Sequence, residues 1–151
     1  MGLILNNKIK KLQKGYPTRT AKEQVEGGVL GGTENLLPGN VVCFGAQPGE
    51  FTATFTEGKI AGIALATNVK LVTTYPGESK DAPFCPGEAI NLMISGYIAV
   101  ELAEGVETVN EGDGAITADG KTFSVAGADD EAFAYFTGVV EGNLAEIKYN
   151  M

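Results

Sequence analysis

The amino-acid sequence predicts an all-β protein: a compact antiparallel sandwich or barrel, of the jelly-roll or β-tulip kind, with an extended basic arm at its N-terminus. Three observations lead to this prediction. Glycine makes up 21 of the 151 residues, proline–glycine pairs recur along the chain, and apolar residues alternate with polar ones between these pairs. Glycine at this density disfavours long helices and suits tight turns between short strands.

The proline–glycine pairs predict turns. Four of the six prolines precede a glycine, at Pro38-Gly39, Pro48-Gly49, Pro76-Gly77 and Pro86-Gly87. Proline fixes φ at about −65° at the first central position of a type II turn, and glycine accepts the positive φ at the second. We therefore expect strands to end and reverse direction at these four places.

Apolar side chains at every second position, interrupted at Gly96, predict a strand with one face in the core and a bend at the glycine. The apolar face consists of Ile90, Leu92, Ile94, Ile98, Val100 and Leu102. The opposite face carries Asn91, Ser95, Tyr97 and Glu101. Shorter strands are expected at 41–44, 51–56, 60–66, 71–75, 115–117, 122–125, 133–140 and 144–149.

Charge divides the chain into two parts. Residues 1–22 hold six of the eleven Lys and Arg residues and no acid, so they carry a charge of +6. Residues 23–151 hold the other five cations and all nineteen acids, a charge of −14, which gives the net charge of −8. We therefore expect a basic arm over residues 1–26 and an acidic β-rich body over residues 27–151, joined at a flexible hinge or tight loop at Gly27–Gly32.

The arm is predicted to dock on an acidic surface, either a neighbouring copy or a larger protein shell. Three of its apolar residues have helical spacing, and Gly15-Tyr16-Pro17 would end such a turn. Nucleic acid is a poor partner because the acidic body would repel phosphate. Removing residues 1–22 is expected to leave the body folded. The predicted contact residues are Lys8, Lys10, Lys11, Lys14, Arg19, Leu5, Ile9 and Leu12.

The sequence offers no constellation for catalysis, cofactor binding or metal binding, so we expect a protein that is not an enzyme. It has no histidine, the commonest general base and metal ligand near neutral pH. Gly120-Lys121-Thr122 lacks the glycine spacing of a phosphate-binding loop, and Asp119-Gly120 predicts a hairpin turn. The acidic runs Asn110–Gly114 and Asp129–Glu131 are interpreted as solvated loops, not as a calcium site or a catalytic carboxylate pair.

The two cysteines, Cys43 and Cys85, have neither a CxxC nor a zinc-binding spacing, and we interpret them as free thiols. The N-terminus lacks the pattern of a secretion signal. No run approaches the roughly 20 apolar residues that a membrane span needs. We therefore expect a protein made in a cytoplasm and without a membrane partner.

Taken in chain order, the glycine turns and strands resemble the cement, or decoration, proteins of tailed-bacteriophage capsids. The segments that carry the resemblance are Gly15–Arg19, Pro38–Gly45, Gly58–Ala64, Pro86–Leu92, Gly96–Val100, Gly112-Asp113 and Phe136–Gly138. The resemblance implies a mechanical role in the virion, without a cofactor. Copies would sit on the outer capsid surface as homodimers or homotrimers at a symmetry axis and clamp neighbouring subunits of the major capsid protein.

Two other functions stay open. A β-rich carbohydrate- or host-surface-binding module would present exposed aromatic rings, for which Tyr75 and Tyr97 are the candidates. A trimeric β-barrel enzyme of the nucleotide-hydrolase kind has a similar length but would need catalytic Asp, Ser and Gly motifs that we do not find. Binding to capsid shells, retention on glycans and nucleotide turnover would separate the three functions.

Overall fold

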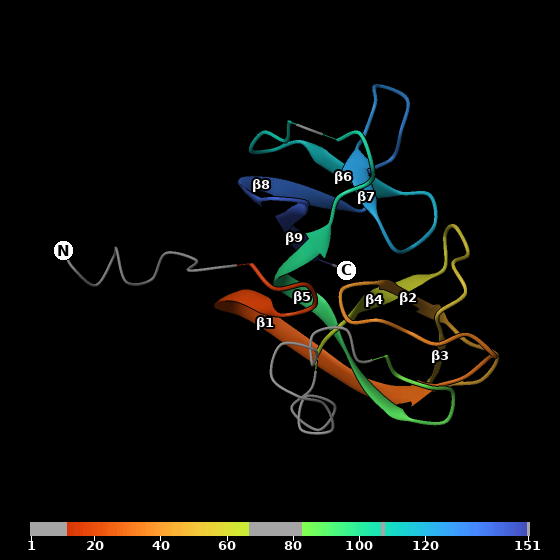
Figure 1. Cartoon of the computed structure of the whole chain (residues 1–151). Coiled ribbons are helices and arrows are strands. Elements are labelled where there is room, and N and C mark those ends of the chain that lie inside the picture. The colour runs from red at the N-terminus through yellow and green to blue at the C-terminus, as the bar shows by residue number, and fades with distance from the viewer. Residues whose placement is uncertain (1–11, 67–82, 107, 151) are drawn as a thin grey trace.

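The computed structural model describes residues 12–66, 83–106 and 108–150, and these form strands and no helix. The all-β class is therefore confirmed, as a closed barrel extended by further strands (Figure 1). None of the described residues belongs to a helix long and apolar enough to cross a membrane. In chain order the strands are β1 (Pro17–Leu30), β2 (Val41–Phe44), β3 (Glu50–Thr52), β4 (Ile60–Ala64), β5 (Ala89–Glu101), β6 (Gly114–Thr117), β7 (Phe123–Val125), β8 (Ala134–Glu141) and β9 (Leu144–Asn150).

The first five strands close a small barrel. β1 pairs with β3, β3 with β2, β2 with β4 and β4 with β5, and β5 pairs back with β1. β1 and β3 run parallel, whereas the other pairs are antiparallel. Closing a sheet on itself supplies hydrogen-bond partners that an open edge would lack.

β5 is the long strand that both halves of the fold share. Its first part lies in the barrel beside β4 and β1, and its second part, from Ser95 to Glu101, pairs with β9. From β9 the sheet continues through β8 and β6 to β7, where Phe123 bridges back to Leu102, just after β5. In Figure 1 the barrel is the lower half of the molecule, β6–β9 are the upper half, and β5 runs between them.

The core consists of two clusters, because successive side chains of a strand point to opposite faces. In β2, Val42 belongs to the cluster of the barrel together with Leu30 and Phe51. Its neighbours Val41 and Cys43 belong to the larger cluster, which the barrel shares with β6–β9. The same strands thus contribute to both clusters.

Five of the six core residues predicted along β5 are buried, and the sixth is half-buried. The buried residues are Ile90, Leu92, Ile98, Val100 and Leu102. The first two lie in the barrel cluster and the last three in the larger one, because β5 bends at Gly96, where φ is +141°. Ile94, two residues before the bend, packs only partly against the barrel cluster. Met93, on the face expected to be polar, is fully buried in the larger cluster.

The predicted turns are confirmed where the structure describes them. Gly39, Gly49 and Gly87 have φ values of +87°, +80° and +94°, as the second central residue of a type II turn requires. The hairpin at Asp119-Gly120 joins β6 to β7, and the Asp119 carboxylate accepts hydrogen bonds from backbone N–H groups of the turn. Pro76-Gly77 and the strand expected at 71–75 lie outside the described residues.

The main correction concerns β1, where we expected an arm and a hinge. β1 runs across the expected division between residues 26 and 27 and includes Gly27-Gly28 of the expected hinge. A Cβ at position 28 would overlap the ring of Phe51, at the place where β1 meets β3 and closes the barrel. Glycine therefore serves close packing here and not flexibility. Of the expected hinge, Gly31 and Gly32 follow the strand.

The segment before β1 is also part of the folded body from Leu12 onward. Leu12 is 2% exposed, and its N–H donates to the Glu141 carboxylate at 3.3 Å. The N–H of Gly15 donates to the carbonyl of Ala99 at 3.0 Å, and its carbonyl accepts the N–H of Ala66 at 2.9 Å. Removing residues 1–22 would therefore remove buried chain, contrary to our expectation. Residues 1–11, with the helical turn expected there, lie outside the described residues.

We expect Leu92→Ala to lower the free energy of unfolding by about 2–5 kcal/mol, because it leaves a cavity in the barrel cluster. Ile94→Ala is the matched control: the side chain lies on the same strand but is only half-buried, so we expect a loss of about 1 kcal/mol. Chemical denaturation of both variants measures the difference. Equal losses of stability would contradict the assignment of Leu92 as buried and Ile94 as half-buried.

Candidate interaction site

Glu146 is a fully buried carboxylate in β9, with an exposed fraction of 0%. Burying a carboxylate without partners costs several kcal/mol, so its oxygens require donors. The hydroxyls of Thr18 and Thr137 each donate to it. Arg19 donates twice, from Nε to Oε2 at 3.1 Å and from Nη2 to Oε1 at 2.7 Å. The carboxylate thus joins β1, β8 and β9.

The Arg19 guanidinium is suited to this position because its planar fork meets both oxygens of a carboxylate at once. The hydrogen bond to Glu146 raises the pKa of Arg19 above its already high usual value, so the residue is cationic at every physiological pH. Its side chain is 45% exposed. The guanidinium therefore neutralises the buried acid while part of the Arg19 side chain stays exposed to solvent.

Arg19 also begins a row of alternating cations and aromatic rings that crosses four strands. The strand register places Arg19 of β1 beside Tyr97 of β5, Tyr97 beside Lys148 of β9, and Lys148 beside Tyr135 of β8. The guanidinium carbon of Arg19 lies 4.5 Å from the centre of the Tyr97 ring, and Lys148 Nζ lies 6.0 Å from it. Both distances suit cation–π attraction. We call these four residues the cation–aromatic row.

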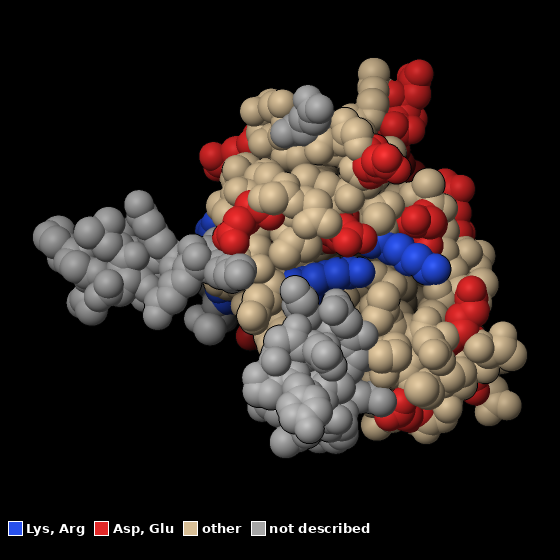
Figure 2. Space-filling view, in the orientation of Figure 1, with Lys and Arg blue, Asp and Glu red and all other residues tan. Residues whose placement is uncertain are grey.

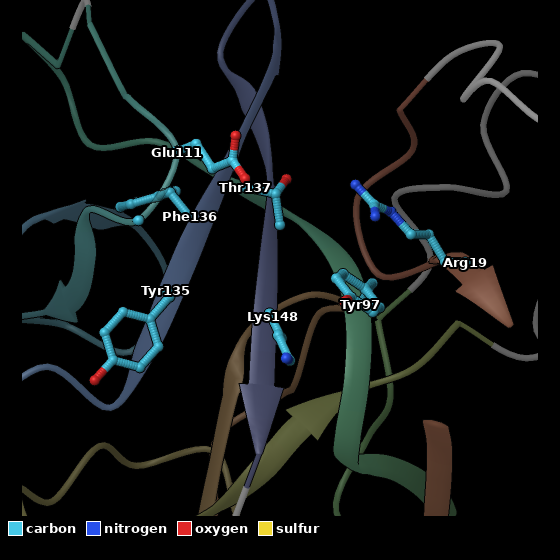
Figure 3. A pocket seen from close by; sticks show the side chains of 8 residues that line it. Arg19, Tyr97, Glu111, Tyr135, Phe136, Thr137 and Lys148 are labelled. Atoms are coloured by element: carbon cyan, nitrogen blue, oxygen red, sulfur yellow. The ribbon is translucent and has the colours of Figure 1, made fainter. Parts of the chain in front are cut away.

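The cation–aromatic row lines an open groove of about 460 Å³. Figure 3 shows Glu111 beside Thr137 at one end of the groove, with Tyr97 and Lys148 toward the other end. Tyr135, which is 57% exposed, turns its ring outward from β8. Exposed donors, a carboxylate and aromatic rings therefore meet on one face of the sheet, an arrangement that can bind a polar segment of another molecule.

The acidic loops that the sequence singled out use their carboxylates for turns. Asp113 accepts the N–H of Asn110 at 2.9 Å, and Asp130 accepts the N–H of Gly127 at 2.8 Å. Within the described ranges, no three His, Cys, Asp or Glu side chains are grouped so that they could hold a metal ion. Cys43, which is buried, and Cys85, which is exposed, are both free thiols, as predicted.

The structure describes three of the eight predicted contact residues, Leu12, Lys14 and Arg19. Lys8, Lys10, Lys11, Leu5 and Ile9 lie outside the described residues. Leu12 is buried in its own body, and Arg19 pairs with Glu146 of its own chain. The aliphatic part of the Lys14 side chain lies against Gly39.

Sequence reasoning missed Glu146, Lys148 and Tyr135. Side chains alternate between the two faces along β8 and β9, as strands require, but no local signal in the sequence indicates that Glu146 is buried. Tyr97, expected as an exposed ring for sugar binding, is partly buried, with the Arg19 guanidinium over it. That ring face is not free to stack on a sugar. Tyr75 lies outside the described residues.

We expect Arg19→Met to lower the free energy of unfolding by about 2–3 kcal/mol, because Glu146 would lose its cation while it stays buried. Combining it with Glu146→Gln, which removes the buried charge, should restore part of that loss. Denaturant unfolding of the two single variants and the double variant measures the coupling. A loss below about 0.5 kcal/mol for Arg19→Met would show that the pair does not hold β1 in place.

Comparisons with known proteins place this fold in a family. A search of curated protein sequences finds no match. Among solved structures, a chain of "The capsid of Myoviridae Phage XM1" has a similar fold, with a TM-score of 0.67 and 16% sequence identity over 92% of this chain and 90% of that chain. The family model described as XM1 gp53 minor capsid protein matches residues 6–149. The chain therefore belongs to the XM1 gp53 minor capsid protein family and is a structural component of a phage capsid.

Proposed function

We propose that the protein is a cement protein, which binds the outer surface of a tailed-phage capsid and clamps neighbouring subunits of the major capsid protein. The observation that carries this proposal is the match of residues 6–149 to a family of minor capsid proteins. Such a role is mechanical and needs no enzymatic activity, cofactor or direct contact with nucleic acid.

The architecture supports a mechanical role. β1 and β5 are the two longest strands, with 14 and 13 residues, and they pair along most of their length. Glu146 adds a charged junction between the first part of β1 and the strands β8 and β9. A pull on the N-terminal end of β1 therefore acts on many hydrogen bonds and on the ion pair of Arg19 with the buried Glu146 carboxylate.

The basic N-terminal segment is the proposed attachment to the shell. We assign the first contacts to Lys8, Lys10 and Lys11, with Leu5 and Ile9 as apolar anchors. Because Leu12 and Gly15 are anchored in the body, we propose that the arm ends at residue 11 instead of residue 26, with Leu12, Lys14 and Arg19 near its base. The remainder of the chain is acidic, and carboxylates are spread over the face in Figure 2.

The acidic partner of the arm is either the shell or a neighbouring copy of the chain. Copies placed at a capsid symmetry axis would form a homodimer or a homotrimer, in which each arm could reach the next body. An exposed ion pair contributes less than about 1 kcal/mol. Several arm contacts on each copy, repeated over a lattice, would nevertheless produce strong attachment through avidity.

We expect deletion of residues 1–11 to lower the occupancy of the protein on undecorated shells while its melting temperature changes little, because the deletion keeps Leu12 and Gly15, which are anchored in the body. A second variant, Lys8→Gln/Lys10→Gln/Lys11→Gln, keeps the apolar anchors and removes three charges. Its occupancy should resemble that of the intact chain at 1 M salt, where the screening length falls to about 3 Å. Occupancy is measured by sedimentation of shells with labelled protein.

Some binding of the intact chain should survive at 1 M salt, since burial of Leu5 and Ile9 is not screened. If the shortened chain decorates shells as fully as the intact chain at every salt concentration, the arm is a solvated tail.

A further inference from the structure

We infer that the cation–aromatic row is a second contact with the shell. The row binds an extended acidic segment of a shell subunit, and Lys148 pairs with a carboxylate of that segment. This inference rests on the proposed function and specifies a surface and a partner chemistry for it. The arm and the row would then attach one copy at two places.

Lys148 is the cation of the row that is available to a partner. Arg19 already gives two donors to Glu146 and has its guanidinium against Tyr97. Lys148 is exposed, and among the described residues no carboxylate lies within ion-pair distance of its ammonium. An ammonium group has three donors, and attraction to one ring leaves them for a carboxylate. The charge of this position therefore favours an acidic group.

Tyr135 supplies the apolar contact beside this charge. It lies opposite Lys148 in the register of β8 and β9 and is 57% exposed, the highest fraction among the large apolar side chains described. Tyrosine and arginine are enriched among the few residues of a protein interface that contribute most of the binding energy, since they combine apolar area with a polar group. The row therefore offers an apolar surface and a cation at neighbouring positions.

The shape of the site suits an extended chain. Neighbouring strands lie about 4.8 Å apart, so four residues in register on four strands span about 15 Å. In an extended segment, side chains on one face repeat every 6.4–6.8 Å or so, so the length of the row accommodates about two such side chains, one a carboxylate at Lys148 and the next an apolar side chain on the side of Tyr135. These residues line the groove of about 460 Å³, with Glu111 at one end.

The charges around the groove favour a protein segment over nucleic acid as the partner. Cations and aromatic rings on a sheet can also bind single-stranded nucleic acid. Here Glu111 lines the same groove, and residues 23–151 carry a charge of −14. Nucleic acid carries a phosphate at every nucleotide, and the acidic body would repel each of them. A protein segment needs only one carboxylate at Lys148, which the lysine ammonium attracts.

The test compares two charge reversals that change net charge equally. Lys148→Glu lies in the row, and Lys121→Glu lies in the exposed turn between β6 and β7, away from the groove lining. Both variants are titrated onto undecorated shells beside the intact chain, with their melting temperatures as a check of folding. We expect Lys148→Glu to weaken binding about tenfold or more and Lys121→Glu to weaken it less than about threefold.

Tyr135 provides an independent pair of variants. Tyr135→Ser should weaken shell binding about fivefold, whereas Tyr135→Phe, which keeps the ring, should bind like the intact chain. Because these changes leave net charge untouched, they test the row even where every charge reversal weakens binding.

The outcomes separate this inference from the proposed function. If the intact chain decorates shells and Lys148→Glu and Tyr135→Ser decorate equally well, the row is not a shell contact and the inference fails alone. If the intact chain does not decorate shells at all, the proposed function fails and takes the inference with it. Binding of a single-stranded oligonucleotide to the isolated protein, lost in Lys148→Glu, would overturn the assignment of a protein partner.

Discussion

The burial of Glu146 on β9 constrains how β1, β8 and β9 pack together. A carboxylate without contact with water must receive hydrogen bonds and a positive charge, and Thr18, Arg19 and Thr137 supply both. This requirement places the first part of β1 over β9, although β1 pairs with β5 along its length. It also positions Arg19 over Tyr97 and so establishes the cation–aromatic row. A single buried charge thereby contributes to the position of the first part of β1 and to which side chains are presented beside it.

A bend in β5 explains how one continuous sheet can enclose two hydrophobic clusters. Between Arg19 and Gln24, β1 advances five residues while β5 advances two, from Tyr97 to Ser95. The extra residues of β1 pass Gly96, where a Cβ would lie 3.0 Å from Met93 Cε and 3.3 Å from the Glu23 Cα. Glycine at this position accepts both the positive φ and the close approach of the neighbouring backbone. The barrel and the strands β6–β9 are consequently parts of one continuous sheet.

Sequence reasoning recovered the features with local signals. Proline–glycine turns and the period-2 stripe of β5 depend on residues close in sequence, and both were found. The barrel strand β1 was missed because most of its residues are polar or glycine. The reason for Gly28 is the ring of Phe51, which is 23 residues away and is not detected by a local pattern. The cation–aromatic row was missed for the same reason, since its four residues come from four strands and meet only through register. The resemblance to capsid cement proteins depended on the order of turns and strands, and the family match supports it.

We propose that the folded body is held on the outside of the shell by its basic segment and by the cation–aromatic row. An electron cryo-microscopy reconstruction of the decorated particle, at a resolution that shows side chains, tests it most directly. We predict that the chain lies on the outer surface, with residues 1–11 on an acidic surface of the shell or of a neighbouring copy. We also predict a carboxylate of a shell subunit at Lys148. Density inside the shell, or on the outside with Lys148 and Tyr135 facing solvent, would contradict it.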